Sequence, residues 1–152
     1  MLSPTELKDR VDTKTVNMVL LTFATGGLYP LLWLSRVYPI LDGITKVKTA
    51  TQTYVIWVAV CVGLGGLFMR AQEDEMAGLG FLISLAANVM YIVWSFSAKK
   101  ALEEYALQNF KIDLRMNAFY TFVFNVYYIN YCINHIPEAD RRQKILVGDT
   151  PA

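Results

Sequence analysis

The sequence has few of the residue types that usually carry catalysis or metal binding. It contains one histidine, His135, and two cysteines, Cys61 and Cys132. It has no Cys-x-x-Cys, His-x-x-x-His or Gly-x-Ser-x-Gly spacing and no phosphate-binding glycine loop. Both cysteines lie in apolar runs, where a single thiol usually behaves as a small hydrophobic side chain. We therefore expect a non-enzymatic protein with no metal site and no cofactor.

Charge is missing from four long parts of the chain. Four runs of 20–23 residues contain no Asp, Glu, Lys or Arg. A bilayer core needs about 20 helical residues, so each run is long enough to cross it. A surface helix of a soluble domain would normally carry a charged face. The sequence predicts an all-α integral membrane protein with one membrane domain over 1–137. Its apolar segments are expected at about 16–35, 51–69, 76–98 and 116–136.

The same lack of charge bears on transport and on partners. Ion-coupled pumps usually place ionisable residues inside their membrane segments, and these runs contain none. The net charge is +1, and no basic stripe suggests nucleic acid. We expect the partners to be membrane lipid and other membrane-protein subunits or further copies of the chain.

The first apolar run is interrupted near its middle. Two glycines lower helix propensity there, and the proline that follows cannot donate a helical hydrogen bond. We predict a backbone break, either a kink or a re-entrant hairpin, made by Thr25, Gly26, Gly27, Tyr29 and Pro30.

The distribution of Lys and Arg predicts the topology. Of the 14 basic residues, only Arg70 lies in the net acidic segment 70–75. Because basic segments stay in the cytoplasm, 51–69 and 76–98 should form one transmembrane hairpin. The outer segments 16–35 and 116–136 should be kinked, re-entrant or interfacial, and we expect them to pack together. Both termini, residues 40–50, an amphipathic helix at 99–115 and a flexible tail at 138–152 should then be cytoplasmic.

Small and polar residues suggest how the segments pack. Small-residue faces let two helices approach closely, and the hairpin carries such residues at Ala59, Gly63, Gly66, Gly80, Ser84 and Ala87. Polar stripes follow helical spacing at Asn88, Tyr91 and Ser95, and at Tyr127, Asn130, Tyr131 and Asn134. The stripes could face each other, line a groove for a lipid head group or partner helix, or line a water-filled path. Trp33 and Tyr38 are expected at interfacial depth, where aromatic residues gather.

The pattern Thr25-x-Gly27-Leu28-Tyr29-x-x-x-Trp33 resembles a family of small bacterial inner-membrane proteins known only as a domain of unknown function. That family is marked by a T-x-G-[IL]-Y-x-x-x-W signature in its first membrane segment. The resemblance implies a bacterial inner-membrane location and supplies no activity.

The two outer segments also resemble each other. Gly27-Leu28-Tyr29 and Asn125-Val126-Tyr127 align at an offset of 98 residues, and the same offset places Pro39 on Pro137. Glycine and asparagine both tolerate left-handed backbone angles. Both positions could therefore mark a turn.

Small size, absent catalytic sets and small-residue helix faces favour an interaction protein. We expect an accessory or scaffold subunit of an inner-membrane assembly. A small oligomeric pore or transporter subunit is the alternative, and a lipid-modifying enzyme is less favoured.

Overall fold

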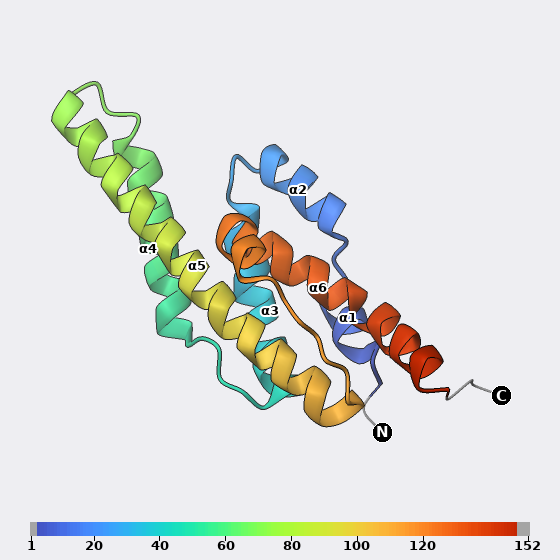
Figure 1. The fold of residues 1–152 in the computed structure, drawn as a ribbon. Coiled ribbons are helices and arrows are strands. Elements are labelled where there is room, and N and C mark those ends of the chain that lie inside the picture. Colours follow the sequence, from blue (N-terminus) through green and yellow to red (C-terminus); the bar gives the residue numbers. More distant parts are fainter. Residues whose placement is uncertain (1–2, 149–152) are drawn as a thin grey trace.

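The computed structural model describes residues 3–148, which form six α-helices (Figure 1). A long antiparallel hairpin of two helices projects from one side of a bundle made by the others. α1, α2, α3 and α6 gather beside the C-terminal half of α5, and α1 and the end of α6 lie away from the hairpin tip (Figure 1). The helices are α1 (Glu6–Val11), α2 (Thr15–Ala24), α3 (Tyr29–Thr45), α4 (Gln52–Phe68), α5 (Asp74–Phe110) and α6 (Ala118–Val147). The all-helical prediction is confirmed.

α5 is one continuous helix of 37 residues. By length and composition it is the one helix within residues 3–148 that could cross a membrane, and α4 is apolar but shorter. The amphipathic helix expected at 99–115 is helical over 99–110, where it continues α5, whereas residues 111–117 are not helical. No glycine or proline interrupts 81–110, so the backbone has no reason to break there. The predicted apolar face is nevertheless real, since Leu102, Tyr105 and Ala106 are buried.

The break in the first apolar run lies between α2 and α3. Gly26 and Gly27 have φ of 61° and 91°, angles that a side chain would strain. Thr25 donates through its hydroxyl to the Leu21 carbonyl at 2.7 Å, and the same oxygen accepts the Tyr29 N–H at 2.9 Å. Pro30 does not break a helix, contrary to the prediction, because it lies in the first turn of α3. Its missing N–H would have no helical partner at that position.

α3 packs against α1, α2, α4 and α5 within the bundle. It runs ten residues beyond the predicted end of the first apolar run, with Pro39 inside it. Trp33 is only 2% exposed and packs edge to face against Trp94 of α5, with ring centroids 5.9 Å apart. The prediction that Trp33 anchors the chain at a membrane interface is therefore wrong. Tyr38 is half-buried and packs against the same core.

The α4–α5 hairpin closes on two glycines, of which the sequence predicted only one. A Cβ on Gly65 would overlap Ser84, and a Cβ on Gly80 would overlap the backbone of Met69 and lie 2.7 Å from the Phe68 carbonyl carbon. Gly63 and Gly66 face open space, so their predicted role in packing is wrong. The physical reason is register: positions 63 and 66 lie on the side of α4 that turns away from α5. Ala59 is half-buried and Ala87 is buried.

α6 is bent near its start and longer than predicted. Asn125 has φ 32° and ψ −112°, and its side chain accepts the Val126 N–H at 2.6 Å. Asn125 and Gly27, which align in the internal repeat, thus both adopt positive φ. The flexible tail predicted from residue 138 is wrong as far as Val147, because ion pairs such as Lys144–Asp140 at 2.8 Å lie along a continuing helix. The rest of that tail, 149–152, lies outside the described residues.

Candidate partner-binding groove

α2 and α6 enclose an open groove of about 640 Å³. Six of its nine lining side chains are aromatic, and the remainder are two threonines and a valine. The lining residues are Thr15, Val19, Thr22, Phe23, Tyr120, Phe124, Tyr127, Tyr128 and Tyr131. We call this surface the aromatic groove. Aromatic walls with few polar groups favour apolar or amphiphilic occupants.

A hydrogen bond between two lining side chains joins the two walls of the aromatic groove. The Tyr127 hydroxyl donates to the Thr22 hydroxyl oxygen at 3.0 Å, and Thr22 donates in turn to the Met18 carbonyl at 2.8 Å. These two consecutive hydrogen bonds give both hydroxyl groups a partner within the protein. The outer apolar segments therefore pack together as the sequence predicted.

Two asparagines of α6 hold the segment that leads into α2. Asn130 is fully buried and donates to the Thr13 carbonyl at 3.0 Å and to the Thr15 hydroxyl at 3.2 Å. Asn134 donates to the same Thr13 carbonyl at 2.9 Å. Buried amides in apolar surroundings are costly unless bonded. These contacts fix the position of α2 and hence the width of the aromatic groove.

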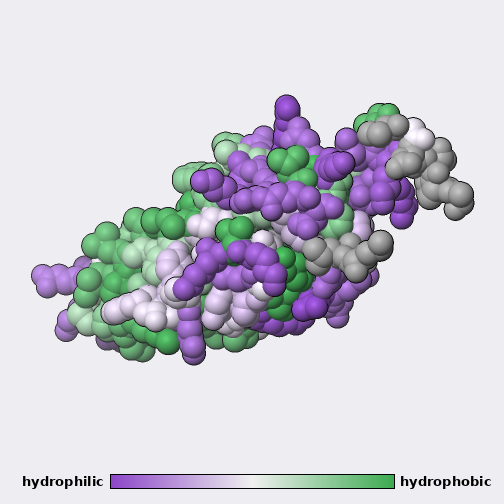
Figure 2. All heavy atoms as spheres, turned by 90° about the horizontal axis from the view of Figure 1, so that it is seen from below, coloured by the Kyte–Doolittle hydropathy of each residue, from purple (hydrophilic) through white to green (hydrophobic). Residues whose placement is uncertain are grey.

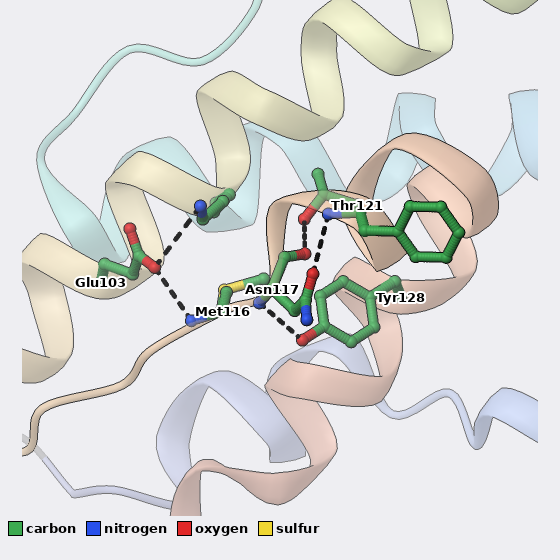
Figure 3. Close-up of polar contacts among 7 residues, drawn as sticks. Glu103, Met116, Asn117, Thr121 and Tyr128 are labelled. Carbon is green, nitrogen blue, oxygen red and sulfur yellow. Dashed lines mark hydrogen bonds and ion pairs between the residues drawn. The ribbon is translucent and has the colours of Figure 1, made fainter.

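The start of α6 is fixed by a polar cluster around the 111–117 connection (Figure 3). Glu103 of α5 accepts the Met116 N–H at 2.9 Å, and the Asn117 side chain caps α6 by accepting the Phe119 N–H at 2.8 Å. The Tyr128 hydroxyl accepts the Asn117 N–H at 3.0 Å. Tyr128 lines the aromatic groove, and its hydroxyl also binds the residue that caps the start of α6 (Figure 3).

Aromatic rings form a continuous row along the α6 wall. Tyr120 and Tyr128 have centroids 5.8 Å apart, and Tyr128 stacks on Tyr131 at 6.3 Å. Tyr131 in turn stacks on His135 with centroids 4.0 Å apart. His135 Nδ1 lies 2.9 Å from the Tyr131 carbonyl oxygen. The row presents an aromatic wall with polar hydroxyl edges, in which Tyr120 is tilted by 55° to Tyr128.

The two polar stripes predicted from the sequence meet at Tyr91 of α5, whose hydroxyl is buried close to Tyr127 of α6. Tyr127, Asn130, Tyr131 and Asn134 all lie where α6 meets α2 and residues 13–15 or the groove. On α5, Asn88 is exposed, and Ser95 is buried with its hydroxyl donating to the Tyr91 carbonyl at 2.8 Å. Asn88 and Ser95 therefore do not face the α6 stripe, and Tyr91 is the member of the α5 stripe that does.

Sequence reasoning placed the α6 wall but missed the α2 wall. Val19, Phe23 and Thr15 were not among the predicted site residues, and neither were Phe124 and Tyr128. The available signal was the expected packing of the outer segments, which brings α2 onto the tyrosine-rich face. Within residues 3–148, no three His, Cys, Asp or Glu side chains gather closely enough to hold a metal ion.

Comparison of the chain with family models, with curated proteins and with solved structures finds no match. The function is therefore argued from the fold and the aromatic groove alone.

Proposed function

We propose that this protein is a non-enzymatic accessory or scaffold subunit of an assembly in the bacterial inner membrane. The observation that carries the proposal is the exposure of apolar residues around the α4–α5 hairpin. Only 11% of the most apolar 18-residue window of α5 is buried. The core helix of a soluble protein would bury most of such a window.

The ends of the hairpin support a membrane placement. Hydrophobic residues cover the end of the molecule formed by α4 and α5, whereas hydrophilic residues gather at the extreme tip and at the opposite end (Figure 2). The tip carries exposed Arg70, Gln72, Glu73 and Asp74. An apolar band between two polar ends is the pattern of a membrane hairpin. We place the tip outside and the bundle end, which holds most basic residues, in the cytoplasm.

The apolar surface of the outer segments supports an interaction role. Phe119 and Phe122 are exposed on α6 and do not line the aromatic groove. Large exposed apolar side chains of this kind offer a contact surface for another membrane protein. The resemblance of the Thr25–Trp33 pattern to small inner-membrane proteins adds support for this location.

Two measurements test the proposal. Carbonate-washed membranes should retain the protein, and recovery in the soluble fraction would reject the membrane placement. Purification in mild detergent, followed by mass spectrometry, should show a stoichiometric second protein. Phe119→Ala combined with Phe122→Ala should reduce that partner, whereas Leu82→Ala, on the hairpin surface, serves as a matched control.

The alternative role as an oligomeric pore predicts a different outcome. Purified protein would then contain only this chain, as a defined oligomer that conducts ions in planar bilayers. That combined result would replace the scaffold proposal.

A further inference from the structure

The aromatic groove and a basic pocket lie in succession along one face of α6. Positions 127, 131, 134, 138 and 141 are three or four residues apart, so they share one face of the helix. Tyr131 lines the aromatic groove, and Asn134 lines the basic pocket one turn later. The basic pocket has a volume of about 460 Å³ and is lined by Lys8, Asn134, Pro137, Glu138, Arg141, Arg142 and Ile145.

The basic pocket carries an excess of positive charge. It holds three cations, Lys8, Arg141 and Arg142, and one carboxylate, Glu138. Glu138 pairs with Arg142 at 2.5 Å and lies 3.9 Å from His135 Nε2. In the part of the chain that the structure describes, Lys8 and Arg141 form no ion pair. Two cationic side chains therefore remain available in the pocket that follows the aromatic groove along α6.

We propose that the aromatic groove and the basic pocket together bind one anionic phospholipid. An acyl chain lies against the tyrosine row, and the phosphate lies between Lys8 and Arg141. This inference rests on the membrane placement in the proposed function, because only a membrane protein meets lipid at this surface. Its occupant is a lipid, whereas the scaffold proposal concerns a protein partner elsewhere on the exposed apolar faces.

The dimensions of the site match a single lipid leaflet. Tyr127 and Arg141 are fourteen positions apart, which corresponds to about 21 Å along the helix at a rise of about 1.5 Å per residue. One leaflet with its head groups is about 20–22 Å thick, half of a bilayer of about 40–45 Å. A phospholipid can therefore reach from the tyrosine row to the basic pocket while lying along α6.

The charge of the pocket selects the class of lipid. A zwitterionic head group carries an ammonium that the two unpaired cations would repel, whereas a phosphatidylglycerol head group adds no positive charge. The basic pocket lies at the end of the molecule away from the hairpin tip, which is the end assigned to the cytoplasm. Basic pockets on that side of membrane helices bind anionic lipid head groups.

Native mass spectrometry of the full chain tests the head-group site. The protein is reconstituted in nanodiscs of equimolar phosphatidylglycerol and phosphatidylcholine, and lipids retained on release are counted. The intact chain should retain phosphatidylglycerol preferentially. Lys8→Gln with Arg141→Gln should lower the ratio of the two lipids about tenfold or more. Lys48→Gln with Lys100→Gln removes the same charge from the same end of the molecule and should leave the ratio unchanged.

Substitution within the aromatic groove tests the acyl-chain site. Val19→Trp places a large side chain in the groove and should abolish retention of either lipid. Leu20→Trp is a matched control on the next residue of α2, which is exposed but does not line the groove. Equal thermal unfolding temperatures of the two variants would show that both are folded.

Several results would overturn the inference. One is that the intact chain retains phosphatidylglycerol and phosphatidylcholine equally. Another is that the ratio of the two lipids falls equally in the Lys8 and Arg141 variant and in its Lys48 and Lys100 control. A photo-crosslinker at position 19 that captures a protein or a second copy in cells, rather than lipid, would also reject it. Membrane-embedded protein without retained lipid rejects the lipid site alone, whereas soluble protein rejects the membrane placement itself.

Discussion

Gly65 and Gly80 are the residues on which the α4–α5 hairpin closes. Gly80→Ala should destabilise the protein by about 1–3 kcal/mol, because its Cβ would meet the backbone of Met69 and Phe68, which cannot move aside as a side chain can. Heating in detergent with tryptophan fluorescence as the readout should show a lower unfolding temperature.

Gly63 and Gly66 supply the control for that substitution. A Cβ at either position meets nothing within 4 Å, and alanine is the better helix former by about 1 kcal/mol. Gly63→Ala should therefore unfold at the same or a higher temperature than the unchanged chain. A loss of stability as large as that of Gly80→Ala would show that the hairpin packs in another register.

Asn130 and Asn134 hold the N-terminal segment onto α6. Replacing both by alanine leaves the buried Thr13 carbonyl without these donors, which costs about 1–3 kcal/mol. Because α2 then loosens, trypsin should cut at Lys14 about ten times faster in detergent solution. Asn17→Ala, which removes an exposed amide of α2, should leave the rate of cleavage unchanged. Unchanged cleavage in the double variant would contradict the described contacts.

The bend at Asn125 sets the course of α6, which forms one wall of the aromatic groove. Asn125→Gly should be tolerated, because glycine adopts positive φ without steric cost. Asn125→Val should lower stability by about 1–3 kcal/mol, since a β-branched residue is strained there. Thermal unfolding of the two variants separates these outcomes, and similar curves would argue against a bent α6.

Helices were easier to predict than their ends and contacts. The uncharged runs located α4 and the apolar part of α5, and Gly26 and Gly27 located the break between α2 and α3. The boundaries of α3 and α5 were missed because their polar extensions pack on the bundle, and tertiary contact extends a helix that hydropathy alone would end. The end of α6 was missed because ion pairs along the helix extend it through exposed residues. The role of Trp33 was missed for a related reason. Hydropathy does not distinguish an aromatic residue at an interface from one in a core.

The aromatic groove could be predicted only in part. The spacing of Tyr127 and Tyr131 on one face of α6 could be read from the sequence, but the α2 wall depends on how two segments about 100 residues apart meet. The hydrogen bonds of Asn130 and Asn134 to residues 13–15 set that meeting. A sequence shows that such amides need partners but does not say which carbonyl they reach.

The molecule as a whole makes a topological prediction for the membrane. With Cys61 and Cys132 replaced by alanine, single cysteines at Gln72, Lys48 and Gln108 should differ in reaction with an impermeant maleimide in intact cells. Only position 72 should react from outside, because it lies at the hairpin tip, whereas the other two lie at the bundle end. Labelling of position 48 from outside would mean that α2 and α3 carry the chain across the membrane.

Because α5 is one unbroken helix, it connects the hairpin tip mechanically to the bundle. Its 37 residues extend about 55 Å, from the exposed tip to Tyr105 in the buried core of the bundle. A helix of this kind tilts as a unit, so sideways displacement of the tip must be matched by opposite movement at the far end or by loosening of the core. In the proposed membrane placement, force applied at the hairpin tip would thereby reach the contacts of α1 and α6 on the opposite side.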